Sequence, residues 1–330
     1  MGPKLRERRF RGAALFWIAG AMGMLWLSGC TTHPLKPGSE RVYFSDDLRV
    51  HSIRTDGSGS FEFSGKPTSC PVVGPNHSIF CASYRGPYFF FDPLRPGIYR
   101  TDWRGSHRHR LTDCPEMALL FGYSSPHSEL VFLTAASPES LRLLSPTGGP
   151  IRSVPLPSAA VAAALDPSGE RAAVILKARL RKVTLGDREW LTEGSDLLIV
   201  PLSGGEATPV EVPALPMELK GSPALESYAA AGMGAICWRD EHQILVSSAP
   251  GLWVLDLRDP SLSLMVRGRA AGTALADGLS VSPDGKSLAL TCGGRLILRD
   301  LATGAERDVT PPGLVGGAHH PAWMEAAGPR

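Results

Sequence analysis

The sequence predicts an all-β protein built from repeated short strands and tight turns. An apolar strand that ends in a polar turn recurs six times, and the last positions of its copies are 43 to 56 residues apart. These positions are Asp56, Asp102, Ser145, Pro201, Asp256 and Asp300. The chain of 330 residues also contains 36 Gly and 29 Pro and lacks a long helical period. This composition favours many strands joined by turns.

A second repeated unit precedes each of these strands except the first, and it has the chemistry of a β-hairpin. In its clearest copy, from 281 to 290, Pro283 presets the backbone angle of a turn, Asp284 can cap that turn, and Gly285 supplies a left-handed conformation. Weaker copies precede the apolar runs at 79–80, 130–132, 172–175 and 244–246. We therefore expect five such hairpins, each followed by one of the recurring strands.

Two of these segments resemble the TolB-type (PD40, WD40-like) propeller repeats. They are Ser282-Pro283-Asp284-Gly285-Lys286, and Asp102-Trp103-Arg104-Gly105 leading to Arg110-Leu111-Thr112. The likeness covers most of residues 40 to 330. It implies four-stranded blades stacked around a central channel. The spacing agrees with the period of about 40 to 45 residues expected for such blades, with longer loops in two of them.

The two ends of the repeat region complement each other. The segment 319–323 resembles the start of another blade, and the strands that this blade lacks are found at the front, in 41–45 and 50–55. Joining these ends completes a blade and removes an exposed sheet edge. We therefore expect a six-bladed propeller closed by N- and C-terminal strands, with seven blades as the alternative.

Residues 1–29 are typical of a lipoprotein signal peptide. A basic stretch precedes an apolar run from Ala13 to Leu27, which is shorter than the roughly 20 residues of a spanning helix. The run ends in Leu27, Ser28 and Gly29 before Cys30, which resembles a lipobox. The resemblance implies cleavage before Cys30 and its modification with diacylglycerol and palmitate. The alternative is an uncleaved membrane anchor with a buried cysteine.

We expect residues 30–39 to form a lipidated, polar, Pro-containing tether, and residues 40–330 to form the propeller domain. Thr31 is not the aspartate that lipoprotein sorting associates with inner-membrane retention. The resemblance therefore implies a lipid-anchored protein of the cell envelope, in the outer membrane, facing the periplasm or the cell surface.

Several functional classes are disfavoured by the sequence. The formal charge of +2 offers no basic stripe for nucleic acid. The Gly-x-Ser-x-Gly motif of serine hydrolases is absent. Asp166, Asp240 and Asp284 sit at predicted hairpin turns, where capping explains them. We expect no cofactor.

Two histidine clusters are candidate metal ligands. His107 and His109 are flanked by arginines, which would repel a cation, and fall in a predicted exposed turn. His319 and His320 open the predicted closing strand. A zinc site needs three or four convergent ligands, so we expect no metal at either cluster.

The cysteines beyond Cys30 fall into two groups. Cys81, Cys237 and Cys292 lie in apolar, strand-like runs and are expected to be buried. Cys70 and Cys114 each precede a proline in a predicted loop. A disulfide between them is left open, because connectivity does not follow from sequence.

Two segments depart from the repeat pattern. The aromatic run with Tyr84, Tyr88, Phe89, Phe90 and Phe91 is either a buried strand or a partner-binding loop. The segment from Lys177 to Glu193 is expected to be a solvated hairpin extension.

These features favour an envelope-anchored lipoprotein whose propeller is a non-catalytic scaffold for an envelope protein partner. The alternative function is that of a metal-dependent hydrolase or carbohydrate-active enzyme that uses the central channel.

Overall fold

A computed structural model describes the chain from residue 40 to residue 324, with gaps. The described ranges are 40–46, 49–63, 69–83, 96–113, 118–176, 180–185, 188–193, 196–210, 233–248, 251–259, 261–267, 276–314 and 317–324. All of them belong to one compact unit, Lys36–Arg330. Within these ranges, no helix has the length and apolarity needed to span a membrane.

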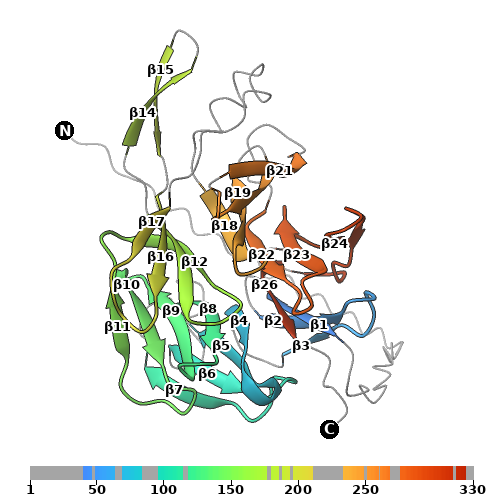
Figure 1. Cartoon of the computed structure of the whole chain (residues 1–330). Coiled ribbons are helices and arrows are strands. Elements are labelled where there is room, and N and C mark those ends of the chain that lie inside the picture. The colour runs from blue at the N-terminus through green and yellow to red at the C-terminus, as the bar shows by residue number, and fades with distance from the viewer. Residues whose placement is uncertain are drawn as a thin grey trace, which may run out of the picture. The chain divides into compact units, whose positions relative to one another are not determined.

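The described residues form six antiparallel sheets of four strands, which are the blades of a propeller (Figure 1). Blade 1 contains β26 (His319–Met324), β1 (Arg41–Ser45), β2 (Val50–Arg54) and β3 (Phe61–Glu62). Blade 2 contains β4 (Ser69–Val73), β5 (Ile79–Ser83), β6 (Gly97–Thr101) and β7 (His109–Asp113), with a 3-10 turn, η1 (Pro75–His77), between β4 and β5. Blade 3 contains β8 (Ala118–Ser124), β9 (Glu129–Thr134), β10 (Ser137–Leu144) and β11 (Arg152–Pro155).

The second half of the chain repeats this order. Blade 4 contains β12 (Ala160–Leu165), β13 (Arg171–Leu176), β16 (Leu197–Pro201) and β17 (Thr208–Val210). Blade 5 contains β18 (Met233–Trp238), β19 (Gln243–Ser248), β20 (Gly251–Asp256) and β21 (Ser261–Arg267). Blade 6 contains β22 (Gly278–Val281), β23 (Ser287–Cys292), β24 (Arg295–Asp300) and β25 (Glu306–Asp308). The prediction of six blades is confirmed, and the seven-bladed alternative is wrong.

The first strands of the six blades form a closed ring. Going round it, β26, β4, β8, β12, β18 and β22 each contact the next, and β22 contacts β26 again. The ring is completed inside blade 1, where the C-terminal strand β26 pairs with β1 in the register Val42↔Trp323 and Arg41↔Met324. The predicted joining of the two chain ends is therefore confirmed.

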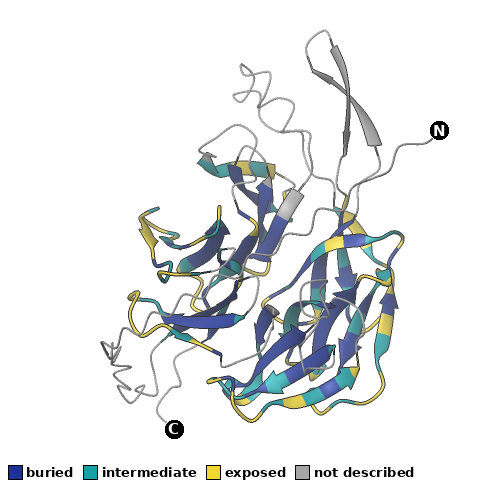
Figure 2. Cartoon of the chain, turned by 180° about the vertical axis from the view of Figure 1, so that it is seen from behind, coloured by how far each residue is buried: buried dark blue, intermediate teal, exposed yellow. Residues whose placement is uncertain are grey.

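The hydrophobic core is divided among the blade interfaces. Each of six clusters of buried side chains joins two neighbouring blades. Strand β13 shows how one strand serves two of them: Val174 packs towards blade 3, whereas Ala173 and Ile175 pack towards blade 5. Successive side chains of a strand point to opposite faces of its sheet, so both faces of a blade are apolar. Figure 2 accordingly shows the middle strands buried and outer strands such as β25 exposed.

The repeated aspartates are turn caps. The Asp166 carboxylate accepts hydrogen bonds from the backbone N–H groups of Glu170 and Arg171, and that of Asp240 accepts from His242 and Gln243. Asp284 accepts from the Lys286 N–H. Gly285 has a φ of 71°, as predicted for its left-handed position. The predicted capping role of these aspartates is confirmed.

The cysteine predictions are confirmed in part. Cys81 and Cys237 are buried, but Cys292 is only partly buried, at the end of β23. Cys70 was placed in a loop and instead lies within β4, where the register against β5 shifts between Ser69 and Val72. Such a bulge accommodates both the positive φ of Cys70, 51°, and the following proline. The proline after Cys70 therefore predicted a loop where the structure has a bulged strand.

The predictions for the segments outside the repeat pattern, and for the histidines and the N-terminal region, have different outcomes. The predicted hairpin is present as β14 (Leu180–Leu185) paired with β15 (Arg188–Glu193), a two-stranded sheet inserted between β13 and β16. His107 is exposed in the turn after β6, as predicted, whereas His109, expected in the same turn, is the exposed first residue of β7. The aromatic run at 84–91, Cys114 and the whole of 1–39 lie outside the described residues, so the predictions made for them stay predictions.

Gly105 and Gly285 form a matched pair for testing how tightly blades 1 and 2 pack. Both have positive φ, 76° and 71°, but a Cβ on Gly105 would lie 2.5 Å from the Phe63 ring, whereas one on Gly285 would meet open space. Gly285→Ala should therefore cost about 1 kcal/mol of backbone strain. Gly105→Ala should cost about 1 to 3 kcal/mol more, because overpacking is added. Urea unfolding of both variants measures the difference, and equal losses would contradict the close blade contact.

Candidate functional site: the central channel

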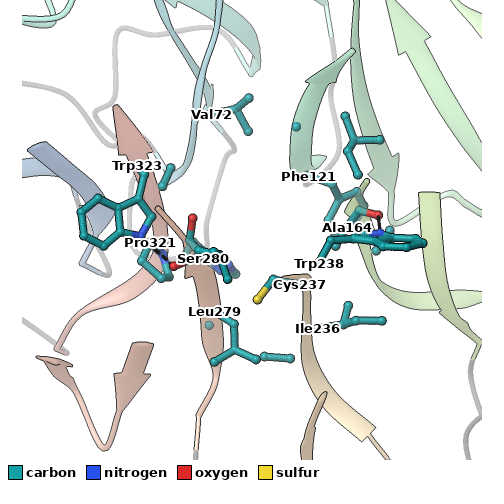
Figure 3. A pocket seen from close by; sticks show the side chains of 18 of the residues that line it. Val72, Phe121, Ala164, Ile236, Cys237, Trp238, Leu279, Ser280, Pro321 and Trp323 are labelled. Carbon is teal, nitrogen blue, oxygen red and sulfur yellow. Dashed lines mark hydrogen bonds between the residues drawn. The ribbon is translucent and has the colours of Figure 1, made fainter. Parts of the chain in front are cut away.

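A cavity of about 810 Å³ lies on the axis of the propeller. It is lined by residues of the first strands of all six blades. The apolar part of its wall includes Val72 of β4, Phe121 of β8, Ile236 of β18 and Leu279 of β22, which Figure 3 shows around one space. The closing strand β26 contributes Pro321 and Trp323. The channel is thus a composite site that exists only when every blade is in place.

The six first strands run in the same direction, which gives the channel two different mouths. The ends of β12 and β18 meet through Trp238, and the ends of β22 and β26 meet through Trp323. We call the face at which these strands begin the loop face. The opposite face, at which they end, carries the short Asp- and Gly-containing turns and is called the turn face.

The long connections leave the blades at the loop face. Leu176, the last residue of β13, pairs with Ala160, the first residue of β12, so the β14–β15 hairpin is inserted there. Likewise, Ala82 near the end of β5 pairs with Ser69 at the start of β4, so the connection from β5 to β6, which contains the aromatic run, starts at this face. Both of these longer connections therefore begin at the loop face.

Two tryptophans join neighbouring blades in the channel wall. The Nε1–H group of Trp238 donates to the carbonyl oxygen of Ala164 in the preceding blade over 3.1 Å. The Nε1–H group of Trp323 donates to the carbonyl oxygen of Ser280, again in the preceding blade, over 2.7 Å (Figure 3). The two residues are structurally equivalent, because Trp238 pairs with Ile244 and Trp323 with Val42 at the same point of their blades.

The Trp238 contact is reinforced from blade 4. The Arg171 guanidinium carbon lies 5.2 Å from the centre of the Trp238 ring, in cation–π geometry. Arg171 is held by its Nε, which donates to the Asp166 Oδ2 atom over 2.9 Å. The Asp166 side chain is almost fully buried and also caps its own turn. Blades 4 and 5 are therefore joined by a hydrogen bond and a stacked cation, and the ion pair within blade 4 holds that cation in place.

Polar groups gather at the loop-face mouth. The Nδ1 atom of His319 lies 3.3 Å from the Oδ2 atom of Asp277. Burial raises the pKa of Asp277, but the hydrogen bond from His319 and the charge of that histidine outweigh it, and the net shift is downward. The pKa of His320 is raised, mainly by its charge interaction with Cys70, against the effect of burial. This mouth thus combines ionisable groups with the apolar wall.

The ionisable groups of this mouth were compared with the requirements of a metal site. Over the described residues, no three or more His, Cys, Asp or Glu side chains are arranged to hold a metal ion. The candidate ligands His319 and His320 lie in the closing strand. Their ring centres are 6.4 Å apart, and the two ring planes are tilted relative to each other. The arrangement suits recognition of a ligand with both apolar and polar groups.

Sequence reasoning did not single out the two channel tryptophans. Their common signal is the position at the end of a first strand, immediately before a blade turns back. Aligning the ends of the first strands would have paired Trp238 with Trp323 only if the closing strand had already been assigned to blade 1. Of the predicted site residues that are described, Cys70 lies on the channel wall.

Comparisons with known proteins support the architecture. No family model and no curated protein matches the sequence. Among solved structures, TolB from Acinetobacter baumannii is similar with a TM-score of 0.59 and 13% identity, over 86% of this chain and 66% of that protein. This chain therefore spans just under two thirds of that TolB. A chain from a nidogen/laminin complex gives a TM-score of 0.59 and 11% identity, over 86% of this chain and 98% of that one. A putative TolB from Agrobacterium tumefaciens gives 0.52 and 12%, over 82% of this chain and 88% of that one.

The hydrogen bond of Trp238 can be tested against a second buried tryptophan. Trp253 is 1% exposed, and its Nε1 atom has no hydrogen-bond partner among the residues that the structure describes. Trp238→Phe and Trp253→Phe remove similar volume, but only the first breaks an interblade hydrogen bond. We expect Trp238→Phe to lower the free energy of unfolding by about 1 kcal/mol more than Trp253→Phe. Chemical denaturation measures both, and a larger loss in Trp253→Phe would refute the assigned role of Trp238.

Proposed function

We propose that the chain is a lipid-anchored protein of the bacterial envelope whose propeller is a non-catalytic scaffold that binds a protein partner. The observation that carries this proposal is the channel, which has an apolar wall and a polar mouth on the face where the long connections leave the blades. Its volume of about 810 Å³ is in the usual range of ligand sites. A segment of a partner protein with an apolar side chain and a nearby charge fits these features.

Exposed apolar surface supports the same proposal. Val161, in the first strand of blade 4, is 46% exposed and lines the channel. Among the described residues it is the single large apolar side chain that is strongly exposed. Exposed apolar groups beside a concave site are typical of interaction surfaces.

The structural comparisons are consistent with this class of function. One similar propeller comes from a complex of nidogen with laminin, and two are TolB proteins. The lipobox at Leu27–Cys30 supports envelope anchoring. For the alternative, a metal-dependent hydrolase or carbohydrate-active enzyme, we find no supporting arrangement of ligands within the described ranges.

Anchoring is tested by labelling cells with palmitate. Wild type should be labelled, and globomycin should cause the unprocessed form to accumulate, because the signal peptidase recognises the lipidated cysteine. Cys30→Ala should abolish labelling, whereas the matched variant Cys292→Ala should keep it. Persistent label in Cys30→Ala would mean that the lipobox assignment is wrong.

The partner-binding role of the channel is tested by crosslinking in cells followed by mass spectrometry. Val161→Arg places a charge on the channel wall and should lower the yield of the main crosslinked partner at least about tenfold, because an unpaired charge would be desolvated on binding. The control variant Thr208→Arg adds the same charge on the exposed outer strand β17, away from the channel wall, and should leave the yield unchanged. Equal yields in the two variants would exclude the channel as the binding site.

A further inference from the structure

The turn face carries a basic surface over blades 1 and 2. Arg54 ends β2, Arg104 and Arg108 lie in the turn after β6, and Arg307 reaches from β25 to the carbonyl oxygen of Thr55. We call these four arginines the basic rim. Arg104 and Arg307 are exposed, and Arg54 and Arg108 are partly exposed. His107 and His109 are exposed in the same segment.

The basic rim is built on a rigid base. The hydroxyl group of Tyr43 donates to the carbonyl oxygen of Trp103 over 3.0 Å, which joins blade 1 to the turn of blade 2. The Trp103 ring packs against Phe61 with its centre 6.2 Å away. The Arg104 guanidinium lies over the Trp103 ring at 4.4 Å. The rim therefore presents its charges, and a partly exposed tryptophan, from a fixed surface.

Carboxylates within this region leave the rim positive. Asp56 accepts a hydrogen bond from the Ser58 N–H, and Asp102 accepts from the N–H groups of Arg104 and Ser106. These bonds hold both carboxylates in their own turns. Glu306, next to Arg307, pairs with Arg299, and Glu40 precedes Arg41 beside Thr55. When Arg41 and Arg299 are counted with the four rim arginines, six guanidinium groups face four carboxylates, so the region keeps a net positive charge.

The opposite side of the turn face has the reverse charge. Over blades 4 and 5, exposed carboxylates belong to Glu170, Glu206, Asp240, Glu241 and Asp259. The described residues of this region include three arginines: Arg171 and Arg258 are each paired with an aspartate, and Arg239 lies in the turn after β18. The turn face is therefore polarised, positive over blades 1 and 2 and negative over blades 4 and 5.

The chain enters the propeller beside the basic rim. Arg41, the first residue of β1, pairs with Arg54 of the rim and with Met324 at the end of β26, so it lies at the turn face. Cys30 is ten residues before Glu40 in the sequence. Fully extended, ten residues reach at most about 36 Å. An anchor on Cys30 would hold the turn face within that distance of the bilayer.

We infer that the basic rim rests on anionic phospholipid headgroups, so that blades 1 and 2 face the membrane and the loop-face mouth of the channel points away from it. The inference rests on the proposed anchoring. Arginines near an anionic surface are attracted to it, within about one Debye length of 8 to 10 Å. Tryptophan is favoured at the same interface. The acidic turns of blades 4 and 5 are repelled, which fixes the tilt of the propeller.

The test measures binding of the chain expressed from residue 31 to vesicles, so that it does not depend on lipidation. This chain contains the whole compact unit Lys36–Arg330. It should cosediment with vesicles of phosphatidylcholine and phosphatidylglycerol at low salt, and not with phosphatidylcholine alone. Arg104→Gln/Arg108→Gln should lower the partition coefficient about fivefold for each arginine, about 25-fold in total. Thermal melting is recorded for each variant to establish that it is folded.

A charge-matched control separates the basic rim from net charge. Arg239→Gln/Arg258→Gln removes the same charge from the turns of blade 5, and it should not weaken binding. Equal losses in the two double variants, or no preference for anionic vesicles in the wild type, would overturn the inference. Failure of the anchor shows separately, as absent palmitate label, and leaves this vesicle result unaffected.

Discussion

No blade of this propeller can be stable by itself, because both faces of each sheet are apolar. Six clusters of buried side chains join the blades in pairs, so every blade depends on two neighbours. The most demanding interface is the one that the chain cannot make until its last strand is in place. There β26 supplies Trp323 to the cluster with blade 6 and Met324 to the cluster with blade 2. Closing the ring with β26 is thus the constraint on which the other features depend.

The channel follows from this closure. Its wall consists of the first strands, which the blade interfaces hold in parallel, and the Trp238 and Trp323 hydrogen bonds set the spacing of neighbouring strands. Five of these strands carry a register shift against the second strand of their blade. Such bulges redirect side chains. They place Cys70 and His320, both with positive φ, at the polar mouth.

Much of the fold could be predicted from the sequence, because its information is local. The turn of Pro283, Asp284 and Gly285 has weaker copies in other blades, and its geometry depends on neighbouring residues alone. The completion of blade 1 was predictable because the C-terminal segment supplies one strand of a blade and the N-terminal segment supplies the strands that this blade lacks. The position of Cys70 in β4 was not, since a bulge depends on pairing with β5.

The candidate site was harder to predict for the same reason. Residues from six strands far apart in sequence line the channel, and its apolar wall residues, such as Ile236 and Leu279, are ordinary core residues in their own repeats. The cation–π contact of Arg171 with Trp238 and the pairing of His319 with Asp277 join different blades and leave no local signal. The polarity of the turn face also appears only when the turns are placed around the ring. The formal charge of +2 gives only the sum over the chain and not the separation of positive and negative turns.

The dependence of the whole fold on β26 is tested most directly by truncation. A chain ending at Gly317 lacks β26, and a chain ending at Met324 retains it. Thermal unfolding followed by circular dichroism should show a cooperative transition in the longer chain and none in the shorter one. A cooperative transition at the same temperature in both would contradict the account, because the blades would then be stable without a closed ring.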